Sequence, residues 1–292
     1  MVSFKAACLQ LNASNVVSDN IATIERLARR AAEAGAQYVQ TPEMSNIIER
    51  DREKLFAAIT TEADDQTLAA CRALASELGI VFHIGSLALK SQDGKIANRA
   101  FAVGPDGAIL ARYDKIHLFD VDLPGGESWR ESATYTAGGE AVLVPVAFAT
   151  LGVSICYDVR FPQLYRALAK AGADVLTAPA AFTRKTGEAH WHVLQRARAI
   201  ENGAFMISAA QAGIHRDGRE TFGHSIIVSP WGEVLAEAAG EGEEVILAEI
   251  DTGQSAEARG RIPSLANERN FAPPSVGPSL APSVAPPMRS AS

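Results

Sequence analysis

The chain has 292 residues, of which 47% are hydrophobic and 21% are charged, a balance that excludes wholesale disorder and allows a sizeable core. Its 27 Lys and Arg against 34 Asp and Glu give a net charge of −7, which disfavours a nucleic-acid partner because such a chain repels a phosphate backbone. No apolar run is long enough for a spanning helix, so no membrane segment is predicted.

Strands and helices are predicted to alternate in the first third of the chain. A short apolar strand over 4–10 precedes a segment, 21–31, in which apolar residues recur at helical spacing. A strand over 37–41 follows and runs into Pro42-Glu43. The same helical spacing returns over 68–78, and another strand is predicted over 80–87. This alternation is typical of α/β proteins.

The middle of the chain changes character. Two strands, 97–103 and 108–113, flank the turn Gly104-Pro105-Asp106-Gly107 and predict a β-hairpin. The apolar run that follows is expected to form strands over 142–145 and 153–155, with Thr150-Leu151-Gly152 as a turn. The remaining predicted elements are a helix over 162–170, a strand over 175–178, a helix over 190–202, and strands over 205–209, 222–228 and 245–250.

These elements predict one α/β layered domain over residues 1–271. Residues 272–292 differ sharply, because 6 Pro, 5 Ser and 4 Ala fill 15 of their 21 positions. Such a composition cannot repay its ordering entropy by burial. We therefore expect a disordered tail after the folded domain.

Three cysteines occur, Cys8, Cys71 and Cys156, an odd number without CxxC spacing. This pattern predicts neither a disulfide framework nor a zinc site. The first residues also lack the charged and apolar regions of a secretory signal. We expect a reducing compartment and a cytoplasmic location.

Cys156 is the first candidate for chemistry. It ends the apolar run Gly152-Val153-Ser154-Ile155 and precedes Pro162, which suits the first turn of a helix, so the thiol is predicted to lie at a strand-to-helix junction. Helix N-terminal amides and Arg160 would favour the reactive thiolate there. A lone cysteine is more often an inert buried residue, which is how we interpret Cys8 and Cys71.

Glu43 and Lys115 each follow a predicted strand directly. Ligand crevices of α/β folds open at the carboxyl ends of strands, although a solvated loop residue is the commoner case for either side chain alone. Taken with Cys156, they provide a base, a cation for an oxyanion and a thiol nucleophile, which is the set that acyl transfer needs.

The sequence lacks the motifs of other common catalytic and cofactor sites. There is no G-x-S-x-G elbow, no G-x-G-x-x-G segment and no Walker loop. The six histidines lack H-E-x-x-H or comparable ligand spacing, so no metal is predicted. We expect no cofactor.

The segments around these residues resemble the nitrilase superfamily of carbon–nitrogen hydrolases. The likeness covers nearly all of 4–271 and is carried by three ordered motifs, Thr41-Pro42-Glu43, 113–120 (YDKIHLFD) and 152–162 (GVSICYDVRFP). It implies a four-layer αββα sandwich in which Glu43, Lys115 and Cys156 converge. Further segments of the same kind are 186–191, 196–202, 223–225 and 230–232.

The resemblance also implies residues around the triad. A second catalytic glutamate is expected at Glu131, because Glu131-Ser132 followed by Gly138 is similar to the family's spacing, with Glu127 as the alternative. Arg160 matches a position that binds a substrate carboxylate, with a surface ion pair as the alternative role. Phe182 matches a position that lines the pocket, with a core aromatic as the alternative.

The mechanism implied is thiol-dependent hydrolysis of an amide. Glu43 would take the proton of Cys156, and Lys115 with the Tyr157 backbone N–H would hold the oxyanion. A thioester would form as the nitrogen leaves, and Glu43 would then activate water. Glu131 would orient Lys115 or the leaving nitrogen.

The segments 209–215 and 117–122 are most similar to the deaminated-glutathione amidase branch. The expected substrate is therefore a small carboxylate-bearing amide, and deaminated glutathione is the first candidate. Its hydrolysis would give 2-oxoglutarate and cysteinylglycine. An ω-amidase, an N-carbamoyl hydrolase, a nitrilase and a non-catalytic scaffold remain alternatives. The resemblance further implies a homo-oligomer, with a dimer formed through helices near 162–170 and 190–202.

Overall fold

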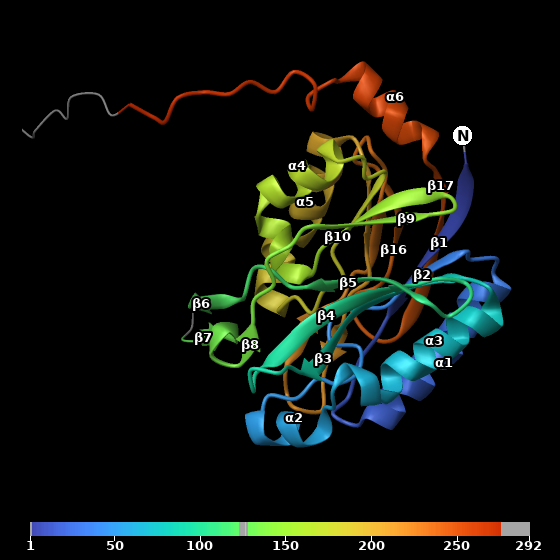
Figure 1. Ribbon diagram of the computed structural model, residues 1–292, viewed down its shortest axis with the longest axis vertical. Coiled ribbons are helices and arrows are strands. Elements are labelled where there is room, and N and C mark those ends of the chain that lie inside the picture. The colour runs from blue at the N-terminus through green and yellow to red at the C-terminus, as the bar shows by residue number, and fades with distance from the viewer. Residues whose placement is uncertain (1, 123–125, 127, 276–292) are drawn as a thin grey trace, which may run out of the picture.

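Two β-sheets lie face to face at the centre of the computed structural model, and helices cover the outer face of each sheet (Figure 1). The structure describes residues 2–122, 126 and 128–275. The predicted four-layer αββα sandwich is confirmed. Among the helices of the described residues, none is long and apolar enough to cross a membrane.

The first sheet contains seven strands and carries the parallel trio that places Glu43. β1, β2 and β3 run parallel, and β17 pairs with β1 in the antiparallel sense. β8 pairs with β4 beside the main path. In spatial order the strands are β17 (Glu244–Asp251), β1 (Ser3–Gln10), β2 (Tyr38–Gln40), β3 (Val81–Lys90), β4 (Ile96–Val103) and β5 (Ile109–Asp114), with β8 at Tyr135–Thr136.

The second sheet contains six strands and has the same plan. Its parallel trio is β10, β11 and β12, and the strands outside the trio pair in the antiparallel sense. In spatial order they are β16 (Val234–Glu237), β15 (Ile226–Val228), β12 (Phe205–Ser208), β11 (Val175–Thr177), β10 (Ala149–Val153) and β9 (Val142–Val146).

Four helices form the outer layers. α1 (Val17–Glu33) and α3 (Gln66–Leu78) bury apolar residues against the first sheet. α4 (Pro162–Lys170) and α5 (Arg184–Asn202) do so against the second sheet. A continuous apolar core joins the inner faces of the two sheets, and each fully buried large side chain there contributes about 1.5–3 kcal/mol.

Smaller elements complete the chain. α2 (Arg52–Ala58) and α6 (Gly253–Arg261) lie outside the four layers. The two-stranded ribbons are β6 (Asp120–Asp122) with β7 (Ser128–Arg130), and β13 (Ala212–Ile214) with β14 (Glu220–Phe222). Single 3-10 turns occupy Glu62–Asp64, Glu131–Ala133 and Cys156–Arg160. The sequence analysis did not predict α2, α6, β6, β7, β8, β13 or β16.

The predicted turn at Thr150-Leu151-Gly152 is wrong. These residues lie inside β10, which ends at Val153, so the strand expected over 153–155 starts and ends too late. Pro145, the last residue of the strand expected over 142–145, lies inside β9, which continues to Val146. β9 is the last strand of its sheet, and an edge strand tolerates a proline because one side of its backbone has no partner strand.

Two other predicted boundaries need correction. α5 begins at Arg184 rather than at 190, and its Gly187 lies against the Phe222 ring, where an added Cβ would come within 2.2 Å. The strand expected over 222–228 is interrupted because Gly223 and His224 both have positive φ, +72° and +56°. The predicted helix over 162–170 is confirmed. Of the predicted tail, residues 276–292 lie outside the described residues.

Candidate active site

The residues predicted to carry the chemistry lie at one edge of the paired sheets. Glu43 follows β2, Lys115 follows β5 and Cys156 follows β10. All three line one pocket of about 560 Å³, together with Glu131 and Arg160. A cavity of this size accommodates a small organic substrate. The structure thus brings together side chains as far apart in sequence as Glu43 and Lys115, which are separated by 72 residues.

Lys115 lies between two carboxylates. Its Nζ donates to Glu43 Oε1 at 2.8 Å and to Glu131 Oε2 at 3.0 Å, and the three side chains are only 3%, 6% and 12% exposed, respectively. Removing one partner of a buried ion pair leaves an uncompensated charge, which is strongly destabilising. The cluster is therefore held in one charge state and one geometry.

Neutral donors satisfy the remaining oxygens of this cluster. Asn98 Nδ2 donates to Glu43 at 2.9 Å and to Glu131 at 3.3 Å. The backbone N–H of Ala181 donates to Glu43 Oε2 at 2.9 Å, and that of Phe119 donates to Glu131 Oε2 at 2.6 Å. Hydrogen bonds to an ionised carboxylate favour the charged form. Two carboxylates can consequently share one ammonium.

The charges of Glu43 and Lys115 support each other. Burial raises the pKa of Glu43, but the Lys115 ammonium and the hydrogen bonds from Lys115, Cys156 and Asn98 together outweigh it, and the pKa ends below its ordinary value. Burial lowers the pKa of Lys115, but Glu131 and Glu43 outweigh it and the pKa ends well above its ordinary value. At neutral pH the pocket therefore holds an ionised carboxylate, which can accept a proton, beside an ammonium, which can stabilise an anion.

Cys156 occupies the strand-to-helix junction that the sequence predicts. It opens the 3-10 turn Cys156–Arg160, and Pro162 follows as the first residue of α4. Its φ is +47°, a left-handed conformation that costs a residue with a side chain about 1–3 kcal/mol. The bond from its N–H to Pro179 O, 2.9 Å, fixes this backbone. The bend presents the thiol to the pocket.

The expectation that helix amides and Arg160 favour the Cys156 thiolate is wrong. Burial and the neighbouring Glu43 carboxylate raise the pKa of the Cys156 thiol well above its ordinary value, and Lys115 offsets only part of this. The interaction with the thiol in turn contributes to the lowered pKa of the Glu43 carboxylate. The sequence pattern does not reveal that the Glu43 carboxylate is buried beside the thiol. Cys156 is thus a protonated thiol, which would need a base before it could attack a substrate.

Asp158 ties the cysteine turn to the lysine segment. Its Oδ2 accepts the N–H of Ile155 at 2.9 Å and the Tyr113 hydroxyl at 2.7 Å, and its Oδ1 accepts the N–H of His117 at 3.1 Å. The carboxylate is fully buried. Sequence reasoning missed this role, although an aspartate two residues after the cysteine in an apolar context was a usable signal.

Of the two candidates for the second glutamate, Glu131 contacts Lys115. It begins the 3-10 turn Glu131–Ala133 and accepts from Lys115, Asn98 and Phe119 as described above. Glu127 lies outside the described residues. The structure therefore brings Glu131 to the triad.

Arg160, Phe182 and Tyr157 line the same pocket. The Arg160 guanidinium lies over the Phe182 ring at 5.3 Å and over the Tyr157 ring at 5.9 Å. Its hydrogen-bond partner is His190 Nδ1 at 3.3 Å. Among the residues that the structure describes, Arg160 forms no ion pair, so it is available to an anionic ligand.

A second cationic region in the pocket was not predicted. The guanidinium groups of Arg219 and Arg50 lie over the Trp129 ring, with Cζ 4.8 Å and 5.5 Å from its centroid. All three residues line the pocket. They come from three segments far apart in the chain, so no local pattern indicated the grouping.

The four-layer fold, with a thiol, carboxylates and an ammonium in one pocket, defines the chain as an enzyme of the amidase class. A family model described as carbon–nitrogen hydrolase matches residues 5–260. The chain belongs to this family, which lies within the nitrilase superfamily.

Curated relatives and a solved structure are similar to this chain over most of its length. A deaminated glutathione amidase from Synechocystis sp. is 40% identical over 91% of this chain and 98% of its own length. The omega-amidase NIT2 of Homo sapiens is 36% identical over 92% of this chain and 96% of its own. The crystal structure of the C. elegans NitFhit protein is 34% identical with a TM-score of 0.86, covering 92% of this chain and 66% of that one.

Proposed function

We propose that Cys156 is the nucleophile of a thiol-dependent amidase, with Glu43 as its base and Lys115 as the cation that stabilises the oxyanion. The raised pKa of the thiol and the lowered pKa of the carboxylate support this division of roles. A protonated thiol hydrogen-bonded to an ionised carboxylate can transfer its proton as it attacks.

The reaction proceeds in two halves. The Cys156 sulfur attacks the amide carbon while its proton passes to Glu43, and the Lys115 ammonium with the Tyr157 backbone N–H holds the oxyanion. Glu43 then returns the proton to the leaving nitrogen, and a thioester remains on the sulfur. Water, deprotonated by Glu43, releases the acid and restores the thiol. Glu131 keeps Lys115 in position throughout.

Arg160 binds the carboxylate of the acyl part of the substrate. Its guanidinium has no anionic partner among the described residues, and the Phe182 and Tyr157 rings hold it against the pocket wall. An α-keto acid carboxylate would form a charge-assisted pair there, which is worth roughly twice a neutral hydrogen bond. This contact would place the substrate amide at a fixed distance from the thiol.

The substrate that fits best is deaminated glutathione, which gives 2-oxoglutarate and cysteinylglycine. The observation that carries this choice is the second cationic region, Arg219 and Arg50 over Trp129, in the same pocket as Arg160. Deaminated glutathione has a carboxylate at each end, whereas 2-oxoglutaramate has one. The 40% identity to a deaminated glutathione amidase supports the same choice.

An ω-amidase is the second candidate, because a relative of that name is 36% identical over almost the same length. Release of 2-oxoglutarate is common to both substrates and allows one assay. We expect kcat/KM to favour deaminated glutathione over 2-oxoglutaramate by more than tenfold. Equal values, or preference for 2-oxoglutaramate, would exclude the proposed substrate.

The Arg219→Gln variant tests the role of the second cationic region. It should raise KM for deaminated glutathione about tenfold and leave KM for 2-oxoglutaramate unchanged, because a charge-assisted contact contributes about 1.5–3 kcal/mol. Arg72→Gln is the matched control, since Arg72 bonds the carbonyl of Gly107 and does not line the pocket. A parallel rise for both substrates would contradict the assignment.

We also propose a cytoplasmic homodimer formed through α4 and α5. Val193 and Ile200 on α5 are 69% and 51% exposed, which is high for large apolar side chains on a helix face. Free thiols at Cys8, Cys71 and Cys156 suit a reducing compartment. Sedimentation of the full chain and of a Val193→Glu/Ile200→Glu variant tests the interface; a monomeric wild-type protein would exclude it.

A further inference from the structure

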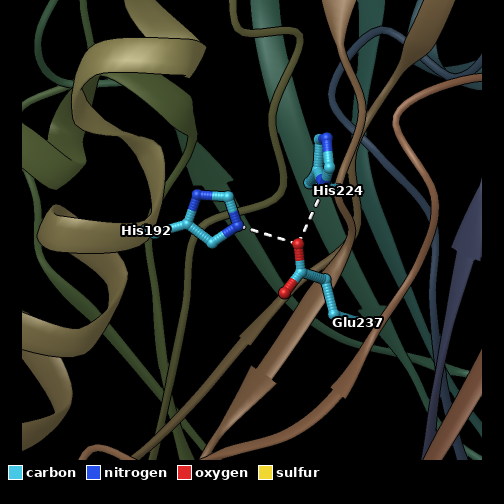
Figure 2. Close-up of side chains that lie close together, drawn as sticks. All are labelled: His192, His224 and Glu237. Atoms are coloured by element: carbon cyan, nitrogen blue, oxygen red, sulfur yellow. Dashed lines mark hydrogen bonds and ion pairs between the residues drawn. The ribbon is translucent and has the colours of Figure 1, made fainter.

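Two histidines and a glutamate converge outside the catalytic pocket. His192 lies on α5, His224 in the turn between β14 and β15, and Glu237 at the end of β16 (Figure 2). Glu237 Oε1 lies 2.8 Å from His192 Nε2 and 2.7 Å from His224 Nδ1. The three ligand atoms all lie within 4.8 Å of one another, and none of the three residues lines the pocket.

The donor set matches a transition metal. Imidazole nitrogen and carboxylate oxygen are ligands of Zn²⁺, at about 2.0–2.2 Å, and two histidines with one glutamate form a recurring three-ligand set. Hard ions such as Mg²⁺ prefer oxygen ligands throughout. A small opening of the two short contacts would admit one ion between the three atoms, with water in a fourth position.

The protein holds the His224 ring in place. His224 has φ +56°, its carbonyl accepts the Trp191 indole N–H at 2.8 Å, and its ring stacks on Phe222 with centroids 4.3 Å apart. Gly240 leaves room for that ring, because a Cβ there would lie 2.8 Å from His224 Nε2. A left-handed backbone at a residue other than glycine is uncommon and persists where the surroundings impose it.

The three side chains can be reached from solvent. Those of His192, His224 and Glu237 are 38%, 28% and 31% exposed, so an ion can enter the cluster.

We propose that His192, His224 and Glu237 form a binding site for a divalent transition metal, with Zn²⁺ as the ion that best fits the ligands. The ion would cross-link α5, the β14–β15 turn and β16 on the outer side of the second sheet. Trp191 connects this site to the pocket, since the centroid of its ring lies 5.0 Å from that of the Phe182 ring. The site lies apart from the amide chemistry and its role is to stabilise this face.

The test uses the full chain in a Cys156→Ala background, because a pocket thiol could itself bind metal. After treatment with a chelator, the protein is titrated with Co²⁺, whose visible absorption intensifies in tetrahedral sites, and the Co²⁺ is then displaced by Zn²⁺. We expect one Co²⁺ per chain and a rise in Tm of about 5 °C at saturating Zn²⁺.

Single substitutions identify the ligands, with a control residue on α5. His192→Gln should weaken Co²⁺ binding at least 100-fold and abolish the Tm rise, and Glu237→Gln should do the same. His190→Gln, two residues away and outside the cluster, should leave both unchanged. Circular dichroism and the Tm of the metal-free proteins establish that each variant is folded. Binding that survives His192→Gln and Glu237→Gln, or no saturable binding by the parent, would overturn the proposal.

Discussion

Two clusters of carboxylate and nitrogen groups in this protein have similar nitrogen–oxygen distances but differ in their exposure to solvent. In the Lys115–Glu43–Glu131 cluster the contacts are 2.8–3.1 Å and the side chains are 12% exposed or less. In the His192–His224–Glu237 cluster they are 2.7 and 2.8 Å, and the side chains are 28–38% exposed. Burial makes a change of charge costly, so the first cluster is held in one charge state. The second can exchange protons and ions with solvent.

The largest expected effect is on turnover at the thiol beside the buried cluster. Cys156→Ala should lower kcat by about 10⁴-fold or more, because both halves of the reaction pass through the sulfur. Steady-state release of 2-oxoglutarate measures this. Cys71→Ala is the control: Cys71 is fully buried on α3, so it should retain turnover and lose about 1 kcal/mol of stability. Equal losses in both variants would contradict the account.

Lys115→Met should change the charge state of Glu43 and lower the stability of the protein. Without the ammonium, burial and the Glu131 carboxylate both favour protonated Glu43, so the pKa of Glu43 rises. Glu43 acts as a base only when ionised, and the acid limb of kcat/KM should therefore move to higher pH. Chemical denaturation should show a loss of about 3–5 kcal/mol. An unmoved acid limb would show that Glu43 is not the base.

Asn98→Ala tests the amide that bridges the two carboxylates. We expect kcat to fall about tenfold and stability to fall by about 1–3 kcal/mol, since buried carboxylate oxygens lose a donor. A pH profile separates this from simple unfolding, because the acid limb should rise by less than in Lys115→Met. Wild-type kcat would exclude a positioning role for Asn98.

The smallest effect is expected in the exposed cluster. In metal-free protein, His192→Gln should change stability by no more than about 0.5 kcal/mol, because half-exposed ion pairs contribute little. Denaturation in the presence of a chelator measures this. A loss as large as that of Lys115→Met would remove the contrast between the two clusters.

The sequence supports the prediction of the fold and of the residues at strand ends. Glu43, Lys115 and Cys156 each follow a strand. The carboxyl ends of these strands lie at the same edge of the paired sheets, where ligand crevices of α/β folds open. Asn98 was missed because its role depends on which face of β4 meets Glu43, which the strand pattern alone does not reveal. The raised pKa of the Cys156 thiol was missed because the burial of the thiol beside Glu43 depends on the tertiary fold.

The histidine cluster could not be found from spacing. Glu237 lies 45 residues from His192 and 13 from His224, and the three come from a helix, a turn and a strand. Motif spacing detects ligands on one element, such as a helical H-E-x-x-H, and fails when folding assembles them. The same limit explains the strand expected over 222–228: two positive φ angles break it at Gly223 and His224, and the apolar pattern does not show them.

Covalent catalysis by Cys156 is tested most directly by the mass of the acyl-enzyme. Full-length protein is mixed with deaminated glutathione, quenched in acid during turnover, digested and analysed by mass spectrometry. We expect the peptide that contains Cys156 to gain the mass of the 2-oxoglutaryl group, and peptides with Cys8 or Cys71 to stay unmodified. Turnover with no adduct under any quench time, or an adduct on another residue, would contradict the account.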